Sequence, residues 1–260
     1  MGSAQVQGAL WGAAARDWAE LAEPVQRPFF EAALDAIGVW DGMALLDAGC
    51  GAGLALTIAA ERGAVVTGLD ASPGLLAVAR ERLPDADLRE GDLEQLPYAD
   101  DSFDAVTAFN SVQYATDPTA ALREIKRVAK QGAPVAVTTW GAPEQCEMRA
   151  VLGAIGALLP PPPPGAGGPF ALAAPGALEQ LVERAGLVAE RAMDVSTPYT
   201  HPDVETAVRS HLASGPARRA IVTAGLDATH DALARVCESA RRADGSVRFD
   251  NVFKVLLARA

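Results

Sequence analysis

The sequence is poor in cysteine and in positive charge. Its three cysteines, Cys50, Cys146 and Cys237, lie far apart, without a CxxC motif or clustered histidines. Neither a disulfide framework nor a structural zinc site is therefore expected. The chain has 22 Lys and Arg residues against 33 Asp and Glu, a formal net charge of −11. Because this charge repels a phosphate backbone and the basic residues are scattered, nucleic acid is not an expected partner.

Long apolar runs are also lacking. No uninterrupted apolar stretch reaches the roughly 18 residues of a membrane span. The N-terminus does not combine a basic segment, an apolar run and a small-residue cleavage site. These patterns predict a cytoplasmic protein without a membrane partner. Apolar residues nevertheless make up 50% of the 260 residues, which is enough for one sizeable core with an insertion.

From Met43 onward, short apolar runs that end in Gly or Asp alternate with helical stretches. This rhythm is typical of buried parallel strands joined by crossover helices. It predicts an α/β fold with a doubly wound, Rossmann-like sheet whose ligand lies at the carboxyl ends of the strands. The predicted strands are 43–48, 64–69, 86–90, 104–109 and 133–139, and the predicted helices are 53–62, 73–82 and 118–129.

Helical spacing of apolar residues predicts two further helices before the first strand, around 11–22 and 29–37. After Trp140 the strand–helix rhythm stops. Five consecutive prolines, 160–164, run into Gly165, Gly167 and Gly168, and we interpret this tract as a stiff connector between lid helices. The other predicted elements are helices at 144–159 and 176–184, a strand at 187–195, helical segments across 203–241, and a last edge or antiparallel strand at 247–257.

The most informative segment is LLDAGCGAG at 45–53, a strand that ends in a glycine-rich turn and opens a helix. Glycines in such a turn let the backbone approach a ligand closely. Asp70 closes the next strand, near the roughly 20-residue offset at which a carboxylate can accept hydrogen bonds from a ribose. Asp92 follows the third strand, where a second acid can meet the amine of an adenine.

Two features disfavour a dinucleotide in this site. The GxGxxG fingerprint requires a third glycine where Leu54 stands, while Gly53 comes one residue early. Asp47 would also repel a pyrophosphate, whereas it would attract an ammonium group. S-adenosylmethionine carries both an ammonium group and an adenosine, and it suits these residues better than NAD does.

With these motifs the sequence resembles the class I S-adenosylmethionine-dependent methyltransferases, particularly the branch similar to ubiquinone/menaquinone-biosynthesis methyltransferases. The resemblance is close over roughly 38–140 and looser elsewhere. It depends on LLDAGCGAG at 45–53, GLDAS at 68–72, GDLEQLPYADDSFDAV at 91–106 and ALREIKRVAKQGAPVAVTTW at 121–140. It implies a seven-stranded sheet whose last strand is antiparallel.

The resemblance also implies where S-adenosyl-L-methionine binds, and its demethylated product S-adenosyl-L-homocysteine with it. The residues implied at the methionine end are Asp47, Gly49, Gly51 and Gly53. Those implied around the adenosine are Asp70 and Ala71 at the ribose and Asp92 and Leu93 at the adenine. Asn110 and Ser111 would lie beside the sulfonium, and Trp18 is expected to close over the carboxylate.

This interpretation divides the chain into four parts. They are an N-terminal helical flap (1–38), a cofactor-binding core (39–140), a mainly helical lid insertion with a sixth strand (141–216), and a C-terminal helix and last strand that complete the core (217–260). The lid is mostly apolar, which predicts a small, largely apolar acceptor bound there. No metal is expected.

The sequence nominates no convincing general base. Tyr114, His201 and His211 are the candidates. The segment SVQY at 111–114 lacks the histidine pair of many relatives, and NSVQ at 110–113 lacks the NPPY-type motif, which disfavours N-methylation of nucleobases or protein amides. The predicted activity is therefore O- or C-methylation of a small molecule, in the manner of secondary metabolism.

Three alternatives remain at this point. The first is an enzyme of the same fold that uses the sulfonium as a fixed positive charge and catalyses a cyclisation, elimination or rearrangement without methyl transfer. The others are an NAD-dependent oxidoreductase and a binding module without chemistry. The sequence leaves the oligomeric state open, with a homodimer as one alternative.

Overall fold

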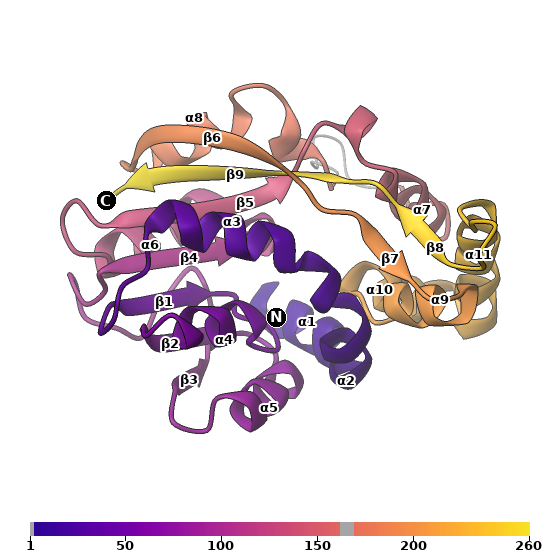
Figure 1. The fold of residues 1–260 in the computed structure, drawn as a ribbon, viewed down its shortest axis with the longest axis horizontal. Coiled ribbons are helices and arrows are strands. Elements are labelled where there is room, and N and C mark those ends of the chain that lie inside the picture. Colours follow the sequence, from indigo (N-terminus) through magenta and orange to yellow (C-terminus); the bar gives the residue numbers. More distant parts are fainter. Residues whose placement is uncertain (1–2, 162–168) are drawn as a thin grey trace.

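The computed structural model describes residues 3–161 and 169–260 and has a seven-stranded sheet at its centre (Figure 1). The strand order is β3-β2-β1-β4-β5-β9-β6. The strands are β1 (Ala44–Ala48), β2 (Val65–Asp70), β3 (Asp87–Glu90), β4 (Ala105–Phe109), β5 (Pro134–Trp140), β6 (Val188–Ser196) and β9 (Val252–Arg259). The first five are parallel, whereas β9 is antiparallel to both neighbours, β5 and β6. The predicted Rossmann-like fold is confirmed.

Each of the five parallel strands begins within one residue of its predicted start. The central strands β1 and β4 are covered by helices on both faces, and all five residues of β4 are buried. A strand buried on both sides is a continuous apolar run in the sequence.

Helices cover both faces of the sheet. On one face α3 (Arg27–Ile37), α4 (Leu54–Glu61) and part of α5 (Pro73–Arg82) contribute apolar residues to one core cluster, and the rest of α5 packs with the N-terminal segment. On the other face α6 (Pro118–Val128) and α8 (Ala177–Arg184) do so in a second cluster. The start of α5 is as predicted, because the Ser72 hydroxyl accepts a hydrogen bond from the Leu75 N–H and Pro73 occupies the first turn.

The prediction of a last edge or antiparallel strand over 247–257 is confirmed in its antiparallel alternative, but the prediction of a single strand over this range was wrong. The segment forms two strands, β8 (Val247–Phe249) and β9, and β9 lies inside the sheet rather than at its edge. The alternation of buried and exposed residues continues through the break because the polar residue Asn251 is buried, with its amide oxygen accepting from the Met148 N–H and its amide nitrogen donating to the Phe249 carbonyl. β8 pairs with β7 (Tyr199–His201) in a separate two-stranded sheet.

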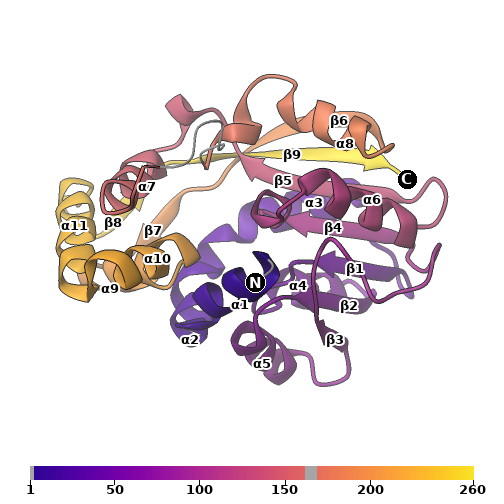
Figure 2. The same ribbon diagram turned by 180° about the vertical axis from the view of Figure 1, so that it is seen from behind.

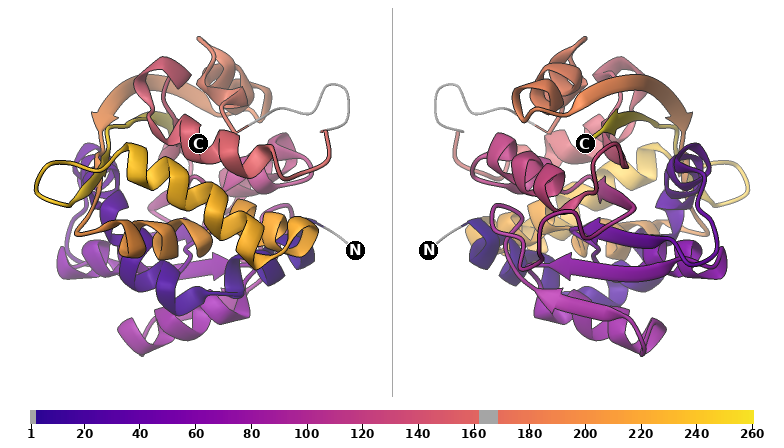
Figure 3. Two further views of the ribbon diagram at one scale, coloured as in Figure 1. Left: turned by 90° about the vertical axis from the view of Figure 1, so that its right-hand side faces the viewer. Right: turned by 90° about the vertical axis from the view of Figure 1, so that its left-hand side faces the viewer.

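A helical cap lies beyond the carboxyl ends of the parallel strands (Figures 1 and 3). It consists of α7 (Met148–Gly156), α9 (Val204–Leu212), α10 (Gly215–Ala224) and α11 (Leu226–Ser239). Since α11 packs against α7, α9 and α10, we propose that the lid continues through α11, past the predicted boundary at residue 216. The short helices η4 (Pro143–Gln145) and η5 (Ala171–Ala173) connect the cap to the core.

The predicted helix at 144–159 is shorter in the structure. It is interrupted at Cys146, after η4, and α7 ends at Gly156. Of the proline tract, Pro160 and Pro161 are described and belong to no helix or strand. The remainder of that predicted connector, Pro162–Pro164 with Gly165, Gly167 and Gly168, lies outside the described residues.

The N-terminal segment is broken into shorter helices than predicted. They are α1 (Ser3–Gly12), α2 (Ala15–Asp17), the π-helix η1 (Trp18–Ala22) and the 3₁₀-helix η2 (Pro24–Gln26). α1 lies between α5 and the cap helix α10 (Figure 2). It touches the end of β2, because a Cβ atom on Gly8 would come within 2.0 Å of the Ala71 carbonyl oxygen. Across the described residues, no helix is both long and apolar enough to cross a membrane.

Candidate functional site

The glycine-rich turn that follows β1 has three glycines with positive φ, +89° at Gly49, +55° at Gly51 and +84° at Gly53. They serve different purposes. A Cβ on Gly49 would come within 2.3 Å of the Ser111 Cβ, and one on Gly53 within 3.1 Å of the Ala79 Cβ. Close packing inside the protein therefore requires these two glycines. A Cβ on Gly51 would lie 3.6 Å from a Glu23 carboxylate oxygen and 3.9 Å from the Trp18 indole nitrogen, so Gly51 faces these two side chains without the close packing seen at Gly49 and Gly53.

Asp70, at the end of β2, holds the glycine-rich turn in place. One carboxylate oxygen accepts a hydrogen bond from the Gly51 N–H at 2.8 Å, and the other accepts one from the Ser72 N–H at 2.8 Å. Each oxygen keeps a further lone pair. The carboxylate can thus accept two more donors, such as the vicinal hydroxyls of a ribose, without losing its backbone partners.

Asp47 is buried at the end of β1, where it accepts a hydrogen bond from the Thr107 hydroxyl at 2.8 Å. Burial raises the pKa of Asp47 to about 7, and the negative charges of Asp70 and Glu23 contribute to that rise, while the Thr107 hydrogen bond opposes it. A cation placed beside this carboxyl would reverse the effect. The turn is therefore electrostatically matched to a positively charged group.

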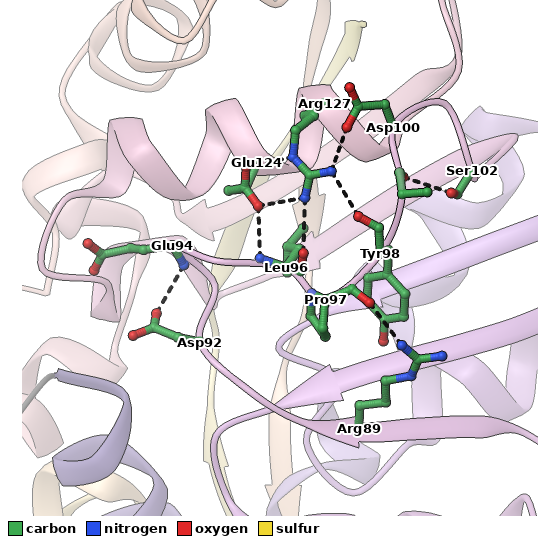
Figure 4. A network of polar contacts seen from close by, with 11 residues as sticks. Arg89, Asp92, Glu94, Leu96, Pro97, Tyr98, Asp100, Ser102, Glu124 and Arg127 are labelled. Carbon is green, nitrogen blue, oxygen red and sulfur yellow. Dashed lines mark hydrogen bonds and ion pairs between the residues drawn. The ribbon is translucent and has the colours of Figure 1, made fainter.

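The loop after β3 carries Asp92 and Leu93, and α6 holds it in place (Figure 4). The Arg127 guanidinium donates to the carbonyl oxygens of Leu96 and Tyr98 at 2.9 and 2.8 Å. Arg127 also forms an ion pair with Glu124, and the Glu124 carboxylate accepts a hydrogen bond from the Leu96 N–H. The Asp92 carboxylate accepts from the Glu94 N–H and remains half-buried. Arg127 and Glu124, which lie about 30 residues after this loop in the sequence, thus position it. No local sequence motif indicated this role.

Asn110 and Ser111 follow β4 directly. Asn110 has φ +49°, a left-handed conformation that asparagine tolerates better than most residues, and its backbone N–H donates to the Thr138 hydroxyl at 3.0 Å. The Ser111 hydroxyl donates to the Ala48 carbonyl at 2.6 Å. These contacts connect the ends of three neighbouring strands, so Asn110 and Ser111 lie next to the glycine-rich turn.

Two residues at this site were not predicted, Glu23 and Arg82. Glu23 is 4% exposed and forms an ion pair with Arg82, from the end of α5. Arg82 also donates to the carbonyl oxygens of Ala52 and Ala19 at 2.8 Å each. The two residues come from distant elements, so sequence spacing could not connect them. The available signal was a glutamate in an otherwise apolar helical stripe after Trp18.

Trp18 reaches the same turn, because its indole nitrogen lies 3.9 Å from the position that a Cβ on Gly51 would occupy. Its ring packs edge-on against Trp11 with centroids 4.7 Å apart, and Trp11 packs edge-on against Tyr114 at 5.5 Å. The N-terminal segment therefore borders both the glycine-rich turn and the residues after β4.

Of the three candidate bases, His201 and His211 are buried and Tyr114 is half-buried. Burial raises the pKa of Tyr114 to about 12 and lowers those of His201 and His211 to about 4 and about 3. The two histidine rings lie 5.7 Å apart between β7 and α9. Tyr114 lies next to the end of β4, where its N–H donates to the Ser111 carbonyl at 3.0 Å, whereas the structure gives no contact between the histidine pair and the glycine-rich turn within the described residues.

Comparison with known proteins agrees with this geometry. The methyltransferase domain family matches residues 46–137. The chain is 32% identical to a malonyl-[acyl-carrier protein] O-methyltransferase of Erwinia pyrifoliae, over 79% of this chain and 74% of that protein. It is 39% identical to a demethylmenaquinone methyltransferase of Renibacterium salmoninarum, over 42% of this chain and 46% of that protein. The chain spans about half the length of several curated relatives that it matches, among them the demethylmenaquinone methyltransferase.

Among solved structures, the [4+2]-cyclase SpnF is similar in fold, with a TM-score of 0.58 and 23% identity over 89% of this chain and 80% of that one. The chain belongs to the class I S-adenosylmethionine-dependent methyltransferases, and the branch that the motifs resembled is supported by the demethylmenaquinone methyltransferase relative. The cofactor of this family is S-adenosyl-L-methionine, as the motifs predicted.

The residues present fit that cofactor. Gly51 lies beside the Glu23 carboxylate and the Trp18 indole nitrogen, the Asp47 carboxyl would gain from a neighbouring cation, and the Asp70 carboxylate can accept hydrogen bonds from hydroxyls. The like-charged cluster is unsuited to a pyrophosphate.

Proposed function

We propose that this protein is an enzyme that methylates a small, largely apolar acceptor. The observation that carries the proposal is the negatively charged, glycine-lined turn at the ends of β1 and β2, beside an apolar cap. S-adenosylmethionine supplies an electrophilic methyl group on a sulfonium, whose leaving group is already good. The chain's own task is then to hold two molecules close and aligned.

In this proposal the cofactor lies along the ends of the first four strands. Asp47 and the turn of Gly49, Gly51 and Gly53 receive the methionine end, with Trp18 over its carboxylate. Asp70 and Ala71 border the ribose. Asp92 and Leu93 border the adenine, and Asn110 and Ser111 lie beside the sulfonium.

The acceptor is assigned to the space beneath the cap, next to the end of β5. Trp140, the last residue of β5, packs against Phe253 at 4.5 Å, Phe170 at 5.8 Å and Tyr199 at 6.2 Å between ring centroids. This aromatic cluster offers few polar partners, which favours an uncharged acceptor. The Tyr114 hydroxyl stays protonated because its pKa is about 12, so its role is to donate a hydrogen bond rather than to remove a proton. The acceptor atom is then an acidic oxygen or a carbon nucleophile.

The experiment is mass spectrometry of products after the protein is incubated with S-adenosylmethionine and a set of enols, phenols and quinols. A product heavier by one methyl group, formed together with S-adenosylhomocysteine, supports the proposal. A product of unchanged mass, formed only when the cofactor is bound, would instead support the cyclase-type alternative, whose fold this chain shares.

A variant in the cap separates the two halves of the site. Phe170→Ala should change acceptor preference while cofactor affinity stays within about 0.5 kcal/mol, as expected for distant and independent sites. Val222→Ala, at a side chain that is 81% exposed on α10, is the matched control. Loss of cofactor binding with unchanged acceptor preference would contradict the assignment of the cap.

A further inference from the structure

The N-terminal segment not only covers the glycine-rich turn but also contributes a carboxylate to it, from Glu23. Glu23 follows the π-helix η1, and its carboxylate reaches the first residue of α4, where one oxygen accepts a hydrogen bond from the Leu54 N–H at 3.3 Å. That same oxygen lies 3.6 Å from the position of a Cβ on Gly51. It is the nearest side-chain atom to that position, which we call the space over Gly51.

The position of Glu23 is determined by Arg82. The guanidinium pairs with the second carboxylate oxygen of Glu23 and donates to the carbonyl oxygens of Ala52 and Ala19. It thus connects α5, the glycine-rich turn and η1. Arg82 engages one carboxylate oxygen of Glu23, and the other oxygen, which accepts from the Leu54 N–H, is the one that borders the space over Gly51.

The charge around this space is one-sided. Asp47, Asp70 and Glu23 surround the turn, and the negative charge of Glu23 contributes to the raised pKa of Asp47. Arg82 balances one of the three carboxylates and is directed at Glu23 rather than at the space over Gly51. The Trp18 indole N–H, a donor without charge, also borders that space, with its nitrogen 3.9 Å from the position of a Cβ on Gly51.

From this arrangement we infer that Glu23 binds the ammonium group of the cofactor's amino-acid end, that Arg82 is its positioning residue, and that the Trp18 N–H receives the carboxylate. The inference rests on the proposed function, since it assigns a residue within the same cofactor site. It makes the N-terminal segment a specificity element that recognises an intact α-amino acid. The adenosine half, held by Asp70, is independent of it.

Two ligands distinguish this role. S-adenosylhomocysteine carries the α-amino acid, whereas 5′-methylthioadenosine shares its adenosine and thioether but lacks the ammonium and carboxylate groups. By calorimetry, Glu23→Gln should bind S-adenosylhomocysteine at least tenfold more weakly than the parent and 5′-methylthioadenosine within twofold of it. Glu20→Gln, at an exposed glutamate on the same π-helix, is the matched control and should bind both ligands like the parent.

Equal weakening of both ligands, or no weakening of either, would overturn the inference. If Glu23→Gln does not fold because Arg82 loses its partner, Trp18→Phe tests the same space, since it keeps the ring and removes the N–H. It should weaken S-adenosylhomocysteine severalfold and leave 5′-methylthioadenosine unchanged, and an equal effect on both would contradict the inference. If the parent binds neither ligand, the proposed function itself is wrong, which is a different outcome from parent binding that Glu23→Gln leaves intact.

Discussion

At the scale of single residues, the ionisation of Asp47 connects the site to pH. The pKa of this buried carboxyl is about 7, raised by burial and by the charges of Asp70 and Glu23, with Thr107 as its hydrogen-bond donor. An ammonium group beside it would favour the ionised form and lower that pKa. Binding should therefore release a proton whenever the free protein carries one on Asp47.

We expect the affinity for S-adenosylhomocysteine to rise as the pH increases through about 7 and to level off above it, with a limiting slope of about tenfold per pH unit below it. Calorimetry in buffers of different ionisation enthalpy measures both the affinity and the proton release. Asp47→Asn should bind with a flat pH profile through this range. An identical profile in parent and variant would assign the ionisation to another group.

Asp70 has two tasks, because it anchors the glycine-rich turn as well as facing the ribose. Asp70→Ala should weaken S-adenosylhomocysteine binding by about 1–3 kcal/mol, the range for losing a charge-assisted hydrogen-bond acceptor. The measurement is calorimetry, with Asp85→Ala at an exposed turn as the control. Unchanged affinity in Asp70→Ala would remove the ribose assignment.

At the scale of elements, α1 is docked backbone to backbone on the end of β2. Gly8 and Gly12 make this possible, since a Cβ on Gly8 would come within 2.0 Å of the Ala71 carbonyl oxygen and one on Gly12 within 2.7 Å of the Ser72 hydroxyl oxygen. The glycines are spaced one helical turn apart and face the same neighbour. A helix docked in this way excludes water from the residues assigned to the ribose.

Gly8→Val should displace α1 while the sheet remains folded, because a branched side chain cannot fit against Ala71. We expect weaker cofactor binding and red-shifted tryptophan fluorescence as Trp11 leaves its contacts with Tyr114 and Gly215. The same substitution at exposed Ala9 is the control. If Gly8→Val retains parent affinity and fluorescence, α1 does not cover the cofactor.

The elements also show which parts of the structure can be predicted from the sequence. The glycine-rich turn and Asp70 were recognisable because their spacing is local. Glu23 and Arg82 were not, because 59 residues separate them and only the packing of η1 on α5 brings them together. The break between β8 and β9 was hidden for a related reason, since the buried Asn251 continues the alternation while its amide satisfies the backbone of α7 and β8.

At the scale of the whole molecule, the two buried histidines make the cap sensitive to acid. His201 faces His211 and the exposed Asp203, and His211 packs against Phe249. The imidazole Nε2 atoms of both histidines are buried without a hydrogen-bond partner within the described residues. Their pKa values, lowered by burial to about 4 and about 3, lie below the ordinary value of 6.5.

The direction of the pH effect on stability follows from comparing histidine protonation in the folded and unfolded protein. Below pH 6.5 the unfolded histidines bind protons that the folded ones exclude until the pH reaches about 4 and about 3. The free energy of unfolding should therefore be highest above pH 6.5 and decrease as the pH falls through this window, by up to about 1.4 kcal/mol per pH unit for each histidine.

Urea denaturation at pH 7 and pH 5 measures this decrease. His211→Phe should lose less stability than the parent between these values, whereas His230→Phe, at an exposed histidine, should lose as much. Equal losses in all three proteins would rule out the buried pair as the cause.

The position of β9 also bears on how the molecule is made on the ribosome. β6 pairs only with β9 in the sheet, and β5 has β9 as its second neighbour. During synthesis, β5 therefore presents an open edge, with the sequence PVAVTTW, until residues 252–259 emerge more than a hundred residues later. Unpaired strands of this kind invite pairing with other chains. The nascent chain can assemble the strand ends assigned to the cofactor early, while its central sheet remains open to aggregation or chaperone capture until translation reaches β9.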